Sequence, residues 1–102
     1  MSTIIDRYRP QIEALCRTHR VRRLDVFGSV IREDFDPVHS DVDFLVEFEP
    51  DPGLNMFHAY MGLRGDLSRL LDRHVDLVMP SAVRNPYFAQ EIAASSEHLY
   101  GA

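Results

Sequence analysis

Aspartates alternate with apolar residues at the start of the segment 41–48, Asp-Val-Asp-Phe-Leu-Val-Glu-Phe, and this alternation predicts a β-strand. Successive side chains of a strand point to opposite faces of the sheet, so Asp41 and Asp43 share one face while Val42 and Phe44 point into the core. Two carboxylates about 7 Å apart on a strand face can share two divalent cations about 3.5 to 4 Å apart, as in-line phosphoryl transfer requires. Two Mg²⁺ ions are expected, because Mg²⁺ takes oxygen ligands and keeps positions open for a triphosphate and water.

A glycine–serine pair precedes this segment at the end of a second apolar run. Gly28-Ser29 follows Phe27 and leads into residues 30–32, which predicts a strand that gives way to a short helical turn. The free N–H groups of such a turn can hold phosphate oxygens, and Gly28 lets the backbone approach a phosphate closely. Arg32 is the best-placed cation, since the chain has no lysine, but a surface ion pair with Glu33 or Asp36 explains it equally well.

A third carboxylate, Asp76, interrupts the β-rich run 75–78. Neighbouring strands lie about 4.8 Å apart, so Asp76 could reach the same metal ions and orient or deprotonate an attacking hydroxyl. Each feature alone has a purely structural explanation as a turn or a strand edge. Three carboxylates gathered in so small a chain are harder to explain in that way, because they repel one another and are costly to desolvate without a cation.

The combination resembles the DNA polymerase beta-like nucleotidyltransferase superfamily and, within it, the minimal nucleotidyltransferase antitoxins that pair with HEPN-domain toxins. The resemblance covers roughly residues 20–100. Its motifs are Phe27-Gly28-Ser29, Arg32, the run 40–48, Val75-Asp76-Leu77 and Asn85-Pro86-Tyr87-Phe88. Many relatives have glycine after the arginine, whereas this chain has Glu33-Asp34, which changes the shape and charge of that loop.

The resemblance implies a role for each matching residue. Gly28 and Ser29 would bind the nucleoside triphosphate, Asp41 and Asp43 would bind metal, and Asp76 would complete the metal and base set. The implied reaction is transfer of AMP from ATP to a hydroxyl, with a tyrosine of a HEPN toxin as the acceptor. The implied fold is a small mixed β-sheet flanked by helices.

Two other functions remain open from the sequence. The chain could neutralise a toxin by binding alone, although the intact Asp41, Asp43 and Asp76 argue against a vestigial site. It could instead modify RNA or a small molecule. The expectation of one domain over residues 1–102 argues against this, because a transferase without a substrate domain must find its acceptor on a partner or in an oligomer.

Composition and charge indicate the cellular compartment and the class of partner that is expected. A single cysteine, Cys16, favours a reducing compartment, and neither a signal peptide nor a membrane span is evident, so a cytoplasmic protein is expected. The net charge of −5 and the lack of interleaved aromatic residues favour a solvated helix end over a nucleic-acid patch, and no direct DNA binding is expected. The basic residues concerned are Arg17, Arg20, Arg22 and Arg23.

Apolar spacing predicts the scaffold of this α/β fold. Strands are expected near residues 23–28, 41–48 and 74–79. A first helix is expected from the helical spacing of apolar residues between Ile5 and His19, with a kink or the start of a second helix at Pro10. A last helix begins near Pro86 and carries Phe88, Ile92 and Leu99 inward. A middle helix is capped by Asn55 and has one apolar stripe. That stripe consists of Met56, Tyr60, Leu63, Leu67, Leu70 and Leu71. The five histidines show no metal-ligand spacing and are given no role.

Overall fold

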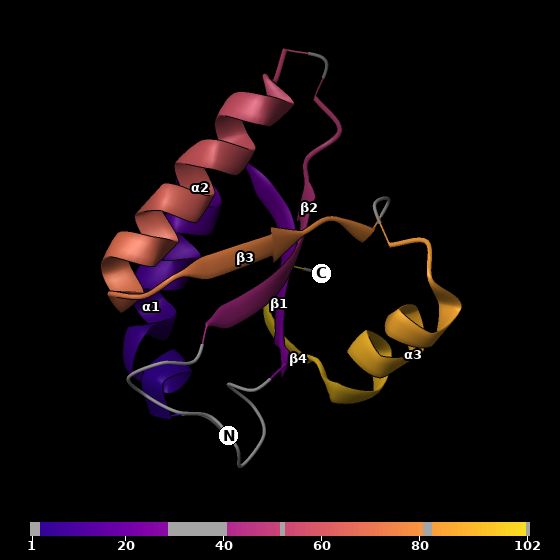
Figure 1. The fold of residues 1–102 in the computed structure, drawn as a ribbon. Coiled ribbons are helices and arrows are strands. Elements are labelled where there is room, and N and C mark those ends of the chain that lie inside the picture. The colour runs from indigo at the N-terminus through magenta and orange to yellow at the C-terminus, as the bar shows by residue number, and fades with distance from the viewer. Residues whose placement is uncertain (1–2, 29–40, 52, 81–82, 102) are drawn as a thin grey trace.

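The computed structural model describes residues 3–28, 41–51, 53–80 and 83–101. These residues form three helices and four strands (Figure 1). The elements in chain order are α1 (Thr3–Thr18), β1 (Val21–Phe27), β2 (Val42–Phe48), α2 (Met56–Leu71), β3 (Val75–Val78), α3 (Pro86–Ser95) and β4 (Glu97–Gly101). The predicted α/β fold with a small mixed sheet is confirmed, and the three predicted strands each agree with the structure to within about two residues at either end.

The four strands form one mixed sheet in the order β3-β2-β1-β4. Strand β1 pairs antiparallel with β2 and with β4, whereas β2 pairs parallel with β3. The long α2 helix makes the crossover that a parallel pair requires. The start of β2 therefore lies beside the end of β1 and beside the start of β3.

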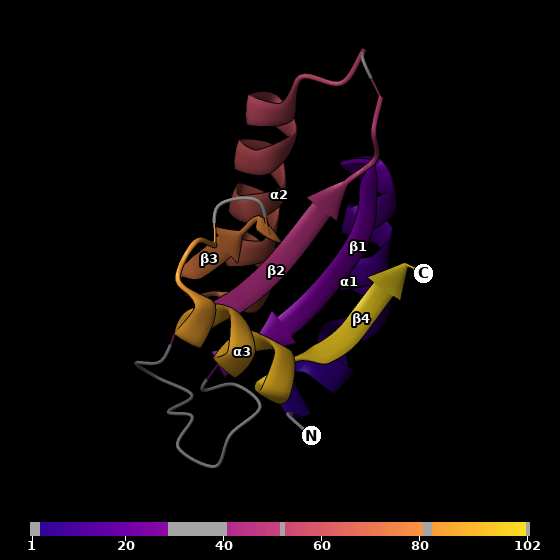
Figure 2. The ribbon, with the colours of Figure 1, turned by 90° about the vertical axis from the view of Figure 1, so that its right-hand side faces the viewer.

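Helices cover both faces of the sheet. Figure 2 shows α3 in front of the sheet and α1 and α2 behind it. Residues of β2 alternate accordingly, since Val42, Phe44 and Val46 are buried while Asp43 and Leu45 are half-buried on the face toward α3. The core between the sheet and the first two helices consists mainly of fully buried side chains. These are Ile5, Ile12, Cys16, Leu24, Val26, Val42, Phe44, Val46, Leu63, Leu67 and Val75.

Helix α2 begins where its sequence indicates. The side chain of Asn55 accepts a hydrogen bond from the N–H of His58, as predicted for an N-cap, and Asp72 ends the helix in the left-handed conformation. The predicted apolar stripe is correct for Leu63, Leu67 and Leu71. It is wrong for Met56, which is 45% exposed, because the first turn of α2 extends past the body of the sheet (Figure 1).

The first and last helices differ in part from expectation. Pro10 lies inside the single helix α1 and starts no second helix. Helix α3 begins at Pro86 as predicted but ends at Ser95, and Leu99 lies in β4 instead of on that helix. Strand β4 covers the free edge of β1 and buries Leu99, a tertiary pairing that local apolar spacing does not reveal. Among the described residues, no helix is long and apolar enough to cross a membrane.

Candidate active site

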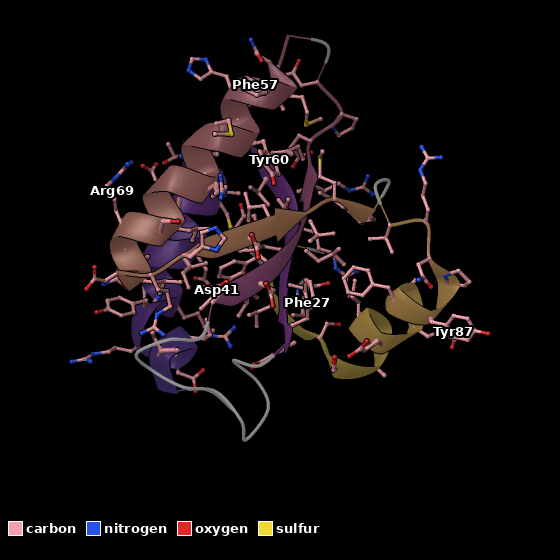
Figure 3. The ribbon with its side chains drawn as sticks, viewed as in Figure 1. Phe27, Asp41, Phe57, Tyr60, Arg69 and Tyr87 are labelled. Carbon is pink, nitrogen blue, oxygen red and sulfur yellow. The ribbon has the colours of Figure 1, made fainter. Side chains whose placement is uncertain are left out.

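The three predicted carboxylates lie at one end of the sheet, where β2 and β3 begin. Asp41 directly precedes β2, and Asp43 in β2 pairs in register with Asp76 in the parallel strand β3. The backbone N–H of Val42 donates to the carbonyl of His74 at 3.2 Å, which holds the starts of the two strands together. Figure 3 shows Asp41 at the same end of the sheet as Phe27, the last residue of β1. Asp43 is thus a neighbour of Asp76 in register, but the close group of possible ligand atoms among the described residues consists of Asp41, His74 and Asp76, without Asp43.

Gly28 directly follows β1 and lies against Asp43. Its φ of +83° is in the left-handed region that favours glycine. A Cβ atom built at Gly28 would lie only 2.6 Å from Oδ2 of Asp43, so a side chain there would displace the carboxylate. A cleft of about 140 Å³ opens beside this pair and is bordered by Phe88 and Glu91 of α3. Ser29 and Arg32, also predicted to bind nucleotide, lie outside the described residues.

His74 is a site residue that the sequence analysis missed. Its Nδ1 atom lies 3.4 Å from Oδ2 of Asp41 and 3.7 Å from Oδ1 of Asp76. Ligand atoms of Asp41, His74 and Asp76 all lie within 4.8 Å of one another. The sequence analysis gave no histidine a role, and the structure places His74 beside two of the predicted carboxylates. Its position two residues before Asp76 was visible in the sequence, but the proximity to Asp41 depends on the parallel pairing of β2 and β3.

Helix α2 fixes the strand that carries Asp76. The Nε atom of Arg64 donates to the carbonyl of Val75 at 3.0 Å, and its Nη2 atom lies 3.1 Å from Nε2 of His74. One turn earlier, the Tyr60 hydroxyl donates to the carbonyl of Leu77 at 2.7 Å. These contacts hold β3, and with it Asp76, against the rest of the fold.

A fourth acid, Asp25, lies further along the same face of the sheet. It is only 5% exposed, and its carboxylate lies 2.9 Å from Nδ1 of His98 and 3.3 Å from Nε of Arg23, which donates to it. Asp25 and Arg23 line an open cleft of about 420 Å³ between the sheet and α3. The sequence signal was an acidic residue inside the apolar run 24–27, but Asp25 is satisfied by its own partners and we assign it a structural role.

The carboxylate oxygens of this site suit a hard divalent cation such as Mg²⁺. Carboxylate oxygens are the ligands that Mg²⁺ prefers, and Asp41 and Asp76 are about half-exposed, so they can reach a cation that still carries water. The glycine at position 28 lets the backbone lie close to the Asp43 carboxylate beside them. The arrangement therefore offers carboxylate ligands to a divalent cation at this end of the sheet.

The fold and this site define a small α/β domain with an acidic centre at the edge of a mixed sheet. A family model described as the nucleotidyltransferase domain matches residues 9–97. The chain is 35% identical over 92 residues to a protein of Methanocaldococcus jannaschii assigned as a protein adenylyltransferase, with 90% of each chain covered. The chain belongs to the nucleotidyltransferase-domain family.

Two further comparisons support the same family. The protein adenylyltransferase MntA of Thermococcus cleftensis is 37% identical over 83 residues, which cover 74% of this chain and 80% of that protein. The crystal structure of a toxin–antitoxin with AMP-PNP matches with a TM-score of 0.67 and 25% identity, over 92% of this chain and 73% of the matched chain. The predicted membership of the minimal nucleotidyltransferases is confirmed.

Proposed function

We propose that this nucleotidyltransferase transfers AMP from ATP to a hydroxyl of a partner protein, and that the partner is a HEPN-domain toxin whose tyrosine is the acceptor. The observation that carries the proposal is the in-register pairing of Asp43 with Asp76, with Asp41 at the start of the same strand. Two relatives named as protein adenylyltransferases and a similar toxin–antitoxin structure with an ATP analogue support it. We further propose that residues 1–102 act as one catalytic domain.

Each residue has a chemical task in this proposal. The Gly28 turn, with Ser29 and Arg32 beyond it, would bind the triphosphate, and Asp41, Asp43 and Asp76 would hold two Mg²⁺ ions. Bound Mg²⁺ supplies positive charge that offsets the charge developing on the phosphoryl oxygens and on the leaving group. The toxin supplies the acceptor hydroxyl.

The reaction balances without a further reactant. The acceptor oxygen forms a bond to the α-phosphorus, the bond from the α-phosphorus to the bridging oxygen of pyrophosphate breaks, and pyrophosphate leaves. Asp76, whose side chain is 49% exposed, takes the proton of the acceptor hydroxyl. The product is an AMP ester of the partner, which would silence a toxin that needs that tyrosine.

The test is incubation with the partner, ATP and Mg²⁺, followed by intact-mass measurement. As partner we would take a HEPN-domain toxin encoded next to this chain. Wild-type protein should add one or more AMP units, and Asp41→Asn or Asp43→Asn should add none, since each removes a cation ligand. Glu49→Gln is the matched control, because Glu49 is an exposed acid just beyond the other end of β2.

The outcomes separate the competing functions. Equal labelling by the Asp41→Asn and Asp43→Asn variants would reject the site assignment. Full toxin neutralisation by variants that add no AMP would favour an antitoxin that acts by binding. Transfer of AMP to RNA or to a small hydroxyl compound, with none to the toxin, would keep the chemistry and reject the protein acceptor.

A further inference from the structure

The contact between Arg64 and His74 determines which imidazole nitrogen carries the proton. A guanidinium has N–H donors and no acceptor, so the Nε2 atom that lies 3.1 Å from Nη2 of Arg64 must accept. In neutral His74 the proton then resides on Nδ1. Arg64 cannot swing away freely, because its Nε atom also donates to the carbonyl of Val75 at 3.0 Å.

The protonated nitrogen is the one that faces the acidic site. Nδ1 of His74 lies 3.4 Å from Asp41 and 3.7 Å from Asp76, and Nε2 faces Arg64. A histidine that binds a metal shows the opposite arrangement: one nitrogen presents its lone pair to the metal and the other donates its N–H to a carboxylate, carbonyl or water. Here the outer nitrogen meets a cationic donor, and the inner nitrogen offers an N–H to the carboxylates.

We infer that Arg64 acts through His74 to keep nitrogen out of the metal coordination, so that the site selects Mg²⁺ and excludes Zn²⁺. Zn²⁺ binds imidazole readily, whereas Mg²⁺ takes oxygen ligands. With Nδ1 protonated, the ligands left to a cation are the carboxylates and water. The inference rests on the proposed function, because it concerns the cation site of that reaction; Arg64 and His74 are positioning residues.

The test compares wild-type protein with Arg64→Met, which keeps an unbranched side chain of similar reach and removes the donors. Arg69→Met is the matched control, because Arg69 lies on the same helix and pairs with Asp66 instead of the site. Long-range ¹⁵N–¹H spectra report which imidazole nitrogen is protonated, and the His74 signal is identified by its loss in His74→Ala. Calorimetric titration with Zn²⁺ and with Mg²⁺ measures selectivity without any turnover.

The expected results follow from the tautomer. Wild-type and Arg69→Met should show the proton on Nδ1 of His74, and Arg64→Met should move it toward Nε2. Zn²⁺ affinity should then rise about tenfold or more in Arg64→Met, fall back in Arg64→Met/His74→Ala, and Mg²⁺ affinity should change far less. A wild-type His74 protonated on Nε2, or an Arg64→Met protein with unchanged Zn²⁺ affinity, would overturn the inference.

These experiments distinguish failure of this inference from failure of the proposed function. If the tautomer and Zn²⁺ results hold but no AMP reaches any acceptor, the control of metal choice stands and the reaction assignment falls. If AMP transfer occurs and Arg64→Met leaves Zn²⁺ binding unchanged, the reaction stands and the role of Arg64 is rejected.

Discussion

Gly28 and Asp43 lie so close that no side chain fits between them: a Cβ atom on Gly28 would stand 2.6 Å from the Asp43 carboxylate. The two residues come from neighbouring strands, since Gly28 follows β1 and Asp43 pairs with Phe27, the last residue of β1. The glycine thus allows the turn to reach the carboxylate that the proposed reaction uses. The contact joins the Gly28 turn to the acidic strand β2.

Gly28→Ala should reduce AMP transfer strongly and lower stability moderately. The left-handed backbone costs a residue with a Cβ roughly 1–2 kcal/mol, and the new methyl group must push the Asp43 carboxylate aside. Urea unfolding and the intact-mass assay measure the two effects. Gly53→Ala is the matched control, because its added Cβ would stand 3.4 Å from Asp51, an ordinary contact. Normal turnover by a folded Gly28→Ala protein would show that the close approach is not needed.

Asp76→Asn should abolish AMP transfer without lowering the melting temperature of the metal-free protein. Asp76 lies opposite Asp43 in register, and two like charges on adjacent strands repel, so removal of one charge is neutral or stabilising. Addition of Mg²⁺ with a non-hydrolysable ATP analogue should raise the melting temperature of wild type and of Glu49→Gln much more than that of Asp76→Asn. An Asp76→Asn protein that melts well below wild type without metal would make Asp76 a structural residue.

Asp66→Asn should destabilise the fold at neutral pH and lose this effect in acid. The hydrogen bond from His19, at 2.6 Å between Nε2 and Oδ2, lowers the pKa of the Asp66 carboxyl, with Arg69 adding to the effect. A lowered pKa means that the ionised carboxylate stabilises the fold above the ordinary carboxyl pKa, near 3.9, and that this contribution is lost as the pH falls through the folded pKa.

Urea unfolding across a pH series tests the Asp66 prediction. At pH 7 the difference in unfolding free energy between wild type and Asp66→Asn should be about 1 kcal/mol, and it should shrink as the pH falls below about 4. Glu49→Gln should show little difference at any pH. A difference that stays constant down to pH 2 would attribute the effect to packing between α1 and α2 and not to charge.

Cys16 should resist thiol reagents until the protein unfolds. Burial in the core raises the pKa of its thiol to about 12, with Glu13 adding to the rise, so the reactive thiolate is scarce at neutral pH. Labelling in native buffer should be slow and should accelerate with urea in parallel with unfolding. Because the folded pKa is raised, this thiol stabilises the fold fully below its ordinary pKa, and the contribution declines as the pH rises toward about 12. Rapid labelling of folded protein would contradict the buried position.

Local sequence patterns determined several features of this fold. The alternation around Asp41 and Asp43, the glycine at position 28, the cap at Asn55 and the start of α3 at Pro86 are set by residues close in the chain, and the structure agrees with each within the described residues. Side-chain period and capping act over a few residues, so a single sequence carries them in readable form.

The tertiary structure determined which residues distant in the chain lie next to one another. Leu99 lies in a strand because its segment pairs with the edge of β1, and the local sequence around Leu99 does not reveal that pairing. His74 came beside Asp41, and Arg64 came beside His74, only through the parallel pairing of β2 with β3 and the return of α2 across the sheet. Contacts between residues distant in the chain depend on strand order and register, which follow from the packing of the whole core and not from the period of any one segment.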